Sequence, residues 1–333
     1  MPHVTHQLSL IIPGLSTVLA KNDAEQPHTA ELKLLLARSE RISCAVNLDA
    51  LLFDLFGYEN NSAKNLPIAP LTYALDTNRN ETGWLLRADP VYMRPDNDRV
   101  LMMGNAFMNI SPSDADVLAH ELCALFSSYG WKFSAPTPKR WYLRLPEDPG
   151  VFFHSLPEVL GHDVHHYLSD DMQNAERTKL WRRVLNEAQM VLHASPVNRA
   201  REARGELPVN SLWFWGSGAL PPAAQPRFAQ VSSNEVLSLS LTKHSGTPCS
   251  AATATAKTWL EQALISGEHL VFVEPGNTLE ELNKNWLAPL FTALKAHQLS
   301  ALDLYAGNGN LFRATPSSVG RWWKRPRSLN VYQ

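Results

Sequence analysis

Apolar residues recur along the chain with two different periods, and together they predict alternating strands and helices. Short apolar runs at Leu8–Ile12, Leu270–Val273 and Ala301–Tyr305 indicate buried strands. Spacings of three and four residues predict helices at Glu31–Arg38 and at Asp49–Phe56, where Gly57 ends the pattern. Two further helices are expected at 253–265 and 279–296, so the last third has the rhythm of a parallel α/β sheet.

The middle of the chain has a different pattern. Short strands are predicted at 84–86, 100–103 and 140–145, with a turn-rich stretch between the first two. A helix should begin after Ser111, which can cap it, and end at Gly130, and the longest helix should run from about Asn174 to Leu192. The continuous apolar run 209–215 (VNSLWFW) is typical of a central strand.

Composition narrows the possible classes of protein. The 333 residues are 44% hydrophobic, and 30 Lys and Arg against 32 Asp and Glu give a formal net charge of -2. A dedicated nucleic-acid binder should be plainly basic, so this balance argues against one. The sequence has three scattered cysteines, no basic leader and no long apolar run. We therefore expect a soluble cytoplasmic protein without a membrane partner.

A histidine-rich segment, GHDVHHYLSDD, is the one candidate metal site. His162, Asp163, His165 and His166 lie close together in sequence, and imidazole and carboxylate groups are ligands of hydrolytic metal sites. A solvated loop beside Pro157 explains the same residues, and we favour it because no third ligand motif of known spacing accompanies them.

Two other segments could bind ligands. A polar series begins on the longest helix, where its members could form the wall of a site or brace the next turn: Asn186, Glu187, Gln189, His193, Asn198, Arg201 and Glu202. The C-terminal RWWKRPR carries Arg321, Trp322, Trp323, Lys324 and Arg325, which could stack on and clamp single-stranded nucleic acid. A terminus whose tryptophans pack against the protein is the interpretation that we favour for RWWKRPR.

One segment resembles a family of bacterial proteins known as phosphoglycerate mutase-like or RpfE-type regulatory proteins. It is the run LNEAQMVLHASPVNRAREARGELPVNSLWFWGSGALP. That family is similar to archaeal-type cofactor-independent phosphoglycerate mutases, which carry H-P-x-N-x-x-R before A-N-x-x-L-x-R-G-x-G. The corresponding residues here are His193, Pro196, Val197, Asn198, Arg201, Val209, Asn210, Gly216 and Gly218. Fainter similarities at 56–59, 84–90 and 140–145 follow in the same order, so the resemblance covers most of the chain.

The resemblance implies an α/β fold with an alkaline-phosphatase-like mixed or parallel sheet core flanked by helices and an inserted α+β subdomain. We expect the core at 1–83 and 206–333 and the insert at 84–205. Mutases of this superfamily hold two divalent metals with Asp and His ligands and attack phosphate with a serine.

The expected catalytic residues are missing from the matching positions. The first strand should end in Asp-Gly but ends in Ile12-Pro13-Gly14, and Asn47–Asp49 occupy the place of the nucleophile. The later ligand motifs read VEPGNTLEEL and YAGNGNLF, and Trp215 replaces an arginine. The resemblance therefore favours the fold and argues against the reaction.

Our leading hypothesis is a non-catalytic binding or regulatory protein that needs no cofactor and binds an unidentified protein or small molecule. Its binding surface is expected around the cleft between core and insert, at Arg87, Asp89, Glu187, Gln189, His193, Asn198, Arg201, Asn210, Trp213 and Trp215. One alternative is a working phosphomutase or phosphohydrolase whose Mn or Zn site is rebuilt from the 162–166 histidines and aspartate. Another is an accessory protein in nucleic-acid metabolism that uses RWWKRPR.

Overall fold

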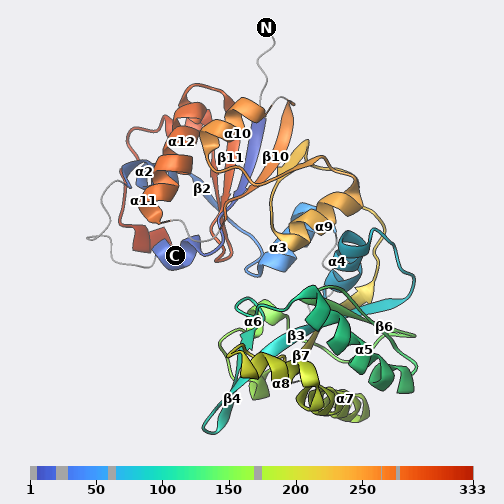
Figure 1. Cartoon of the computed structure of the whole chain (residues 1–333). Helices are drawn as coiled ribbons and strands as arrows, with labels where there is room; N and C mark the ends of the chain where they lie inside the picture. The colour runs from blue at the N-terminus through green and yellow to red at the C-terminus, as the bar shows by residue number, and fades with distance from the viewer. Residues whose placement is uncertain are drawn as a thin grey trace. The chain divides into compact units, whose positions relative to one another are not determined.

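The computed structural model describes residues 6–19, 29–58, 65–168, 175–263, 265–274 and 278–332. The chain divides into two compact units (Figure 1): unit 1 comprises Met1–Asn60 and Ala223–Gln333, and unit 2 comprises Asn61–Pro222. Within the described residues, no helix has the length and apolar character needed to cross a membrane.

A seven-stranded mixed sheet forms the centre of unit 1, in the order β2-β12-β11-β1-β10-β8-β9. Strand β1 (His6–Ile11) is parallel to both β10 (Gly267–Phe272) and β11 (Leu299–Tyr305), as the rhythm of the last third predicts. The other strands are β2 (Glu40–Ser43), β8 (Gln230–Ser232), β9 (Cys249–Ser250) and β12 (Asn310–Ala314). Among the pairings of this sheet that the described residues form, the two made by β12 are antiparallel and the others are parallel.

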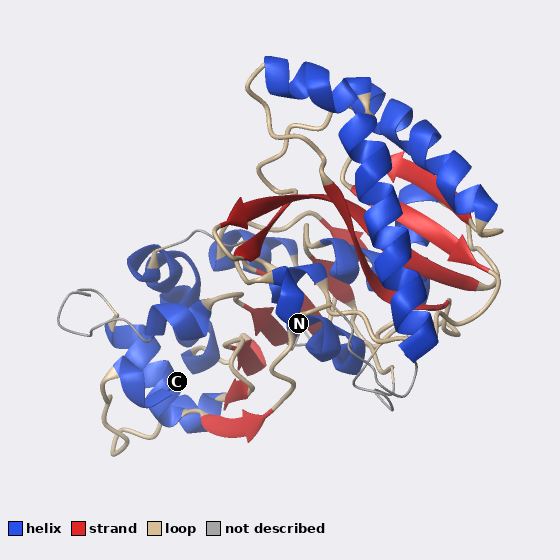
Figure 2. Cartoon of the chain, turned by 90° about the horizontal axis from the view of Figure 1, so that it is seen from below, coloured by secondary structure: helices blue, strands red, loops and turns tan. Residues whose placement is uncertain are grey.

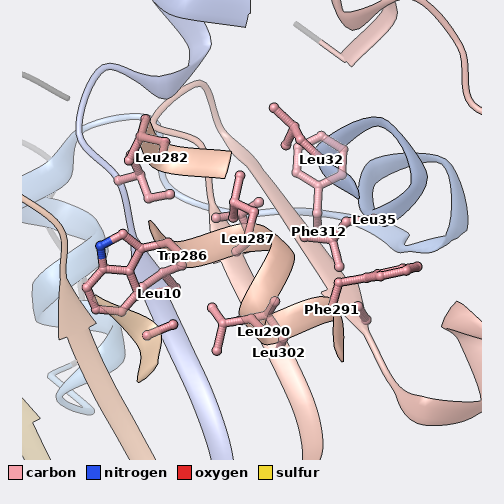
Figure 3. Close-up of a cluster of buried hydrophobic side chains, with 14 of the residues drawn as sticks. Leu10, Leu32, Leu35, Leu282, Trp286, Leu287, Leu290, Phe291, Leu302 and Phe312 are labelled. Carbon is pink, nitrogen blue, oxygen red and sulfur yellow. The ribbon is translucent and has the colours of Figure 1, made fainter. Parts of the chain in front are cut away.

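One face of this sheet is covered by helices whose buried side chains form a single core. Alternate residues of β1, Leu8 and Leu10, point into it because side chains alternate along a strand. Figure 3 shows Leu10 and Leu302 of the strands beside Trp286, Leu287 and other helix residues. The helices of unit 1 are α1 (Leu15–Leu19), α2 (Ala30–Arg38), α3 (Leu48–Leu55), α9 (Val236–Ser245), α10 (Ala256–Gln262), α11 (Leu279–Leu282), η4 (Asn283–Leu287), α12 (Ala288–Lys295), α13 (Pro316–Val319) and η5 (Leu329–Tyr332).

Unit 2 is built on an antiparallel five-stranded sheet. Strand β3 (Trp84–Asp96) pairs with β4 (Arg99–Gly104), with β6 (Arg140–Leu145) and with β7 (Ser211–Ala219), and β6 pairs with β5 (Lys132–Thr137). The two long helices α5 (Pro112–Ser128) and α7 (Ala175–Ala194) lie side by side over the sheet (Figure 2). The remaining helices are α4 (Ile68–Thr77), α6 (Leu156–Val159), η2 (Val164–His166) and α8 (Pro196–Ala203).

The predicted helix start at Ser111 is confirmed, because its side chain accepts a hydrogen bond from the Asp114 backbone N–H at 3.0 Å. The prediction of a central strand at 209–215 is wrong. Among the described residues β7 pairs with β3 alone, and it is buried because α4 and α7 pack against it. Two close approaches make this packing possible: a Cβ at Gly218 would lie 2.6 Å from the Pro67 side chain, and Gly216 has a φ of +65° beside Ile68.

The predicted boundaries also differ from the division that the structure makes. Helix α4 and strand β7 were expected in the core, but both contact β3 and belong to unit 2. The mixed α/β architecture flanked by helices is confirmed, and it agrees with the expected alkaline-phosphatase-like arrangement.

Candidate functional site

All ten residues of the predicted binding surface belong to unit 2, where most of them bond to one another or to the backbone. The centre is a buried ion pair on β3. Arg87 donates to Asp89 through Nε at 2.9 Å and through Nη2 at 2.7 Å. Their side chains are 7% and 1% exposed. The two predicted surface residues therefore pair with each other, and water hardly reaches them.

Trp215 completes this buried cluster. Its indole Nε1 donates to Asp89 Oδ2 at 2.8 Å, and the Arg87 guanidinium carbon lies 4.9 Å from the centre of its ring. Burial raises the pKa of the Asp89 carboxyl, and the guanidinium and the indole N–H act against that shift. Asp89 thus receives a charged donor from Arg87 and a neutral donor from Trp215.

A second ion pair lies beside the first, and the sequence analysis missed it. Arg140 of β6 binds Asp76 of α4 through Nη2 at 2.5 Å and Nε at 2.8 Å, and the Tyr142 hydroxyl donates to Asp76 at 2.6 Å. The Tyr142 ring also lies 5.5 Å from Arg87. Burial raises the pKa of the Tyr142 hydroxyl. No helix was predicted at 68–77, although the apolar spacing of IAPLTYAL was a signal for α4.

Two asparagines brace the backbone. Asn198 donates to the carbonyls of Leu192 and Val209 at 2.8 and 2.7 Å and accepts from the Val209 N–H at 2.9 Å. Asn210 accepts from the Met93 N–H at 2.8 Å and donates to the Met93 carbonyl at 2.7 Å. Their polar groups are used inside the fold, as the bracing interpretation expects.

Arg201 is also internal, with 0% exposure. It donates to the Leu207 and Asn109 carbonyls at 3.0 and 2.8 Å and to Asp114 at 2.8 Å. It therefore ties α8 to the start of α5. Three of the predicted residues lie on α7. Glu187 accepts a hydrogen bond from Tyr129, Gln189 donates one to Ser211, and His193 is exposed.

Trp213 lines a small cavity. A pocket of about 40 Å³ lies between α7, β7 and the 153–168 segment, and its lining includes Phe153, Tyr167, Trp181 and Phe214. The Trp213 indole donates to the His154 carbonyl at 2.9 Å, which fixes the ring in the wall. A mostly aromatic pocket of this size fits one apolar group and not a phosphate.

The histidine-rich segment forms a short surface turn. Asp163 accepts from the backbone N–H groups of His165 and Val100 at 3.2 and 3.4 Å, and its carboxylate lies 3.9 Å from His166 Nε2. The ring of His162 lies beside Tyr167, with 5.8 Å between their centres. Asp170 and Asp171 lie outside the described residues.

In unit 1, the carboxyl ends of the parallel strands meet at the edge where sheets of this kind bind ligands. Ile12 and Pro13 follow β1, and Ile12 is 3% exposed within the core. After the neighbouring strands come Glu274, which accepts from Asn234, and Glu235. Glu235 caps α9 by accepting two backbone N–H groups at 2.9 and 2.6 Å.

These residues do not fit a pair of divalent metals. Such a pair needs several carboxylate or imidazole ligands. Of the two carboxylates here, Glu235 already caps a helix, and burial raises its pKa. Asn47, near the nucleophile's place, caps α3 by accepting from the Ala50 N–H at 3.1 Å. In the part of the chain that the structure describes, no three His, Cys, Asp or Glu side chains gather as metal ligands. Residues 275–277 of VEPGNTLEEL lie outside that part.

Comparison with known proteins supports the fold. No family model and no curated protein matches the chain. Among solved structures, the PH0037 protein from Pyrococcus horikoshii is 12% identical with a TM-score of 0.56, and the match covers 98% of this chain and 92% of that one. A cofactor-independent phosphoglycerate mutase from Thermoplasma acidophilum is 15% identical with a TM-score of 0.46, over 98% and 94% of the two chains. At these identities, the first match indicates a shared fold.

Proposed function

We propose that this chain is a phosphoglycerate mutase-like protein that has lost the mutase chemistry and acts by binding a partner or small ligand. The mutase likeness rests on the 185–221 segment and on the order of the fainter segments around it. The fold is compatible with that ancestry.

The carboxyl end of β1 is the observation that carries the proposal. A metal-dependent phosphoryl transfer needs a ligand there to neutralise the phosphate before an alkoxide attacks. Ile12 is buried in the core, and the Pro13 side chain has no donor atom. Restoring a ligand at this point would require replacing a core side chain.

The unit 2 residues that match the mutase motif support the same conclusion. Asn198 and Arg201 form hydrogen bonds within the fold and have at most 4% exposure. A phosphate-binding arginine must present its donors to a ligand. Arg201 directs Nε to Leu207 and Nη1 to Asn109 and Asp114, and its remaining Nη2 is buried without a partner. The motif thus serves as a framework for unit 2. The pocket beside Trp213 is the binding element that we propose, with an apolar group of the ligand as its occupant.

A turnover assay tests this function. The purified chain is supplied with manganese or zinc and with 3-phosphoglycerate, and in parallel with p-nitrophenyl phosphate to detect hydrolysis. We expect wild type and His165→Ala to give the same background rate. Mutase or phosphatase turnover that is abolished in His165→Ala, with stoichiometric bound metal, would establish the rebuilt metal site and overturn the proposal.

A further inference from the structure

Unit 1 contains a groove at its C-terminal segment that the proposed function does not use. Its cavity volume is about 560 Å³, and it lies between the end of α2, strands β2 and β12 and the segment 323–332. Phe312 and Tyr332 form part of its lining, with 6.1 Å between their ring centres, and they are 1% and 8% exposed. A volume of this size accommodates a small-molecule ligand.

The segment that carries the groove is held at both ends. Val319 precedes it and Leu329 follows it, and both are completely buried in the unit 1 core. The intervening RWWKRPR stretch is therefore fixed against α2 and β12, although its tryptophans do not pack inward. The prediction that these tryptophans pack against the protein is wrong, because Trp322 is 80% exposed and Trp323 is 63% exposed.

The lining is cationic. It includes Arg41, Lys324, Arg325 and Arg327 and no carboxylate side chain. Within the described residues, no Asp or Glu forms an ion pair with any of the three cations from the C-terminal segment. Because the whole chain has a formal charge of -2, this concentration of positive charge is local. The guanidinium and ammonium groups of Lys324, Arg325 and Arg327 around this concavity should attract a phosphate or carboxylate.

The groove also offers an aromatic face. Trp323 lines it, and Trp322 does not, although the two rings are neighbours with their centres 6.1 Å apart. An exposed indole beside unpaired cations matches a ligand that has both a planar ring and an anion. An acidic peptide supplies the charge without a ring to stack, and a flat anionic membrane does not enter a concavity. A nucleotide supplies both.

We propose that this groove binds a nucleotide unit, with the base stacked on Trp323 and the phosphate held by Lys324, Arg325 and Arg327. A free nucleotide and one nucleotide of a single-stranded nucleic acid share this chemistry. The site lies wholly within unit 1 and is independent of whether the chain has any catalytic activity.

The test uses fluorescence anisotropy with a short fluorescein-labelled oligothymidine, in competition with unlabelled oligothymidine, with AMP and with inorganic phosphate. Trp323→Ala should weaken binding about tenfold or more, the loss expected for one stacked base. Trp322→Ala is the matched control and should stay within about twofold of wild type, because that ring lies outside the groove.

A second variant tests the charge. With three to four phosphate contacts and a slope of about -0.7 per contact, binding of the single strand should weaken about 20- to 50-fold between about 50 and about 200 mM salt. Arg325→Gln with Arg327→Gln should weaken binding and reduce that salt slope, whereas Arg199→Gln on exposed α8 should change neither. Circular dichroism melting checks that every variant is folded.

The outcomes separate the possible ligands. Competition by oligothymidine alone assigns the site to a single strand, and competition by AMP as well assigns it to any nucleotide; both support the proposal. Competition by inorganic phosphate as strong as that by AMP would contradict the role of Trp323. Three results would each overturn the proposal. The first is that neither oligothymidine nor AMP binds at about 50 mM salt. The others are equal losses of binding in the two tryptophan variants, and binding to phosphatidylserine vesicles alone.

Discussion

The two units place the same kinds of side chain in opposite ways. In unit 2, an arginine and a tryptophan meet a carboxylate in the interior, where Arg87 and Asp89 are 6% and 1% exposed. In unit 1, arginines and a tryptophan line an open groove, and Trp323 is 63% exposed. The presence of arginine and tryptophan in a site therefore says little about function until their burial and their partners are known.

The difference also separates two kinds of polar residue. In unit 2, the buried side chains of Arg87 and Asp89 bond to each other, and Asn198 bonds to the backbone, so their removal should destabilise the fold. Lys324, Arg325 and Arg327 of the unit 1 groove form no ion pair with a described Asp or Glu, so their removal should alter ligand binding with little effect on stability.

The largest effect should come from Arg87→Ala, which leaves the Asp89 carboxylate buried without its cation. We expect a loss of about 3–5 kcal/mol in the free energy of unfolding, because a buried charge without a partner is strongly destabilising. Urea denaturation measures the loss, and hydrogen exchange should locate it in unit 2.

Arg99→Ala is the control for that variant. Arg99 and Asp96 also form an ion pair at the other end of the β3–β4 hairpin, but their side chains are 56% and 35% exposed. This exposed pair should contribute at most about 1 kcal/mol. Equal effects of Arg87→Ala and Arg99→Ala would show that the buried cluster is not the brace that we describe.

Asn198→Ala should have the next largest effect. It leaves the Val209 N–H and the carbonyls of Leu192 and Val209 without their partner in a buried turn. The expected loss is about 1–3 kcal/mol by urea denaturation. Asn186→Ala on the exposed side of α7 should change stability by less than about 0.5 kcal/mol. If Asn198→Ala were neutral, Asn198 would be free to serve a ligand.

Unit 1 should respond to acid through a buried histidine pair. His6 Nδ1 and His269 Nε2 lie 3.3 Å apart, and burial lowers the pKa of both imidazoles from 6.5. The unfolded state then binds more protons, so the free energy of unfolding should fall as the pH drops below 6.5. Hydrogen exchange of β1 and β10 at a series of pH values measures this, and replacing both histidines with Asn should flatten the dependence. An unchanged slope in that double variant would contradict this assignment.

The smallest effect on stability should come from Arg325→Gln in the groove. We expect a change within about 0.5 kcal/mol by thermal melting, because no carboxylate in the described residues pairs with this side chain. A large loss would mean that the groove cations stabilise unit 1, and the contrast between the units would fail.

Local patterns predicted much of the fold. The apolar run of β1, the spacing of α2 and the Ser111 cap of α5 each depend on neighbouring residues, and each is found near its predicted bounds. Helix α4 was missed because Pro67 and Pro70 obscured its spacing. The position of β7 in its sheet could not be predicted, because strand order depends on distant pairing with β3.

The candidate site was only partly predictable, for a related reason. Arg87 and Asp89 were both named as candidates, but the strand that places them on one face was predicted to end at residue 86 and in fact extends to Asp96. The sequence could not show that Asp76 and Arg140 form a second ion pair nearby. It also could not show that Asn198 and Arg201 form hydrogen bonds within the fold. Such partners come from segments far apart in the chain.

Calorimetric titration of manganese into the chelator-treated chain tests the central claim most directly. The account holds that the fold persists while the residues for a two-metal site are missing. It predicts no saturable binding of manganese in the micromolar range and no change in melting temperature. Binding of one or two equivalents at micromolar affinity, with a raised melting temperature, would contradict it.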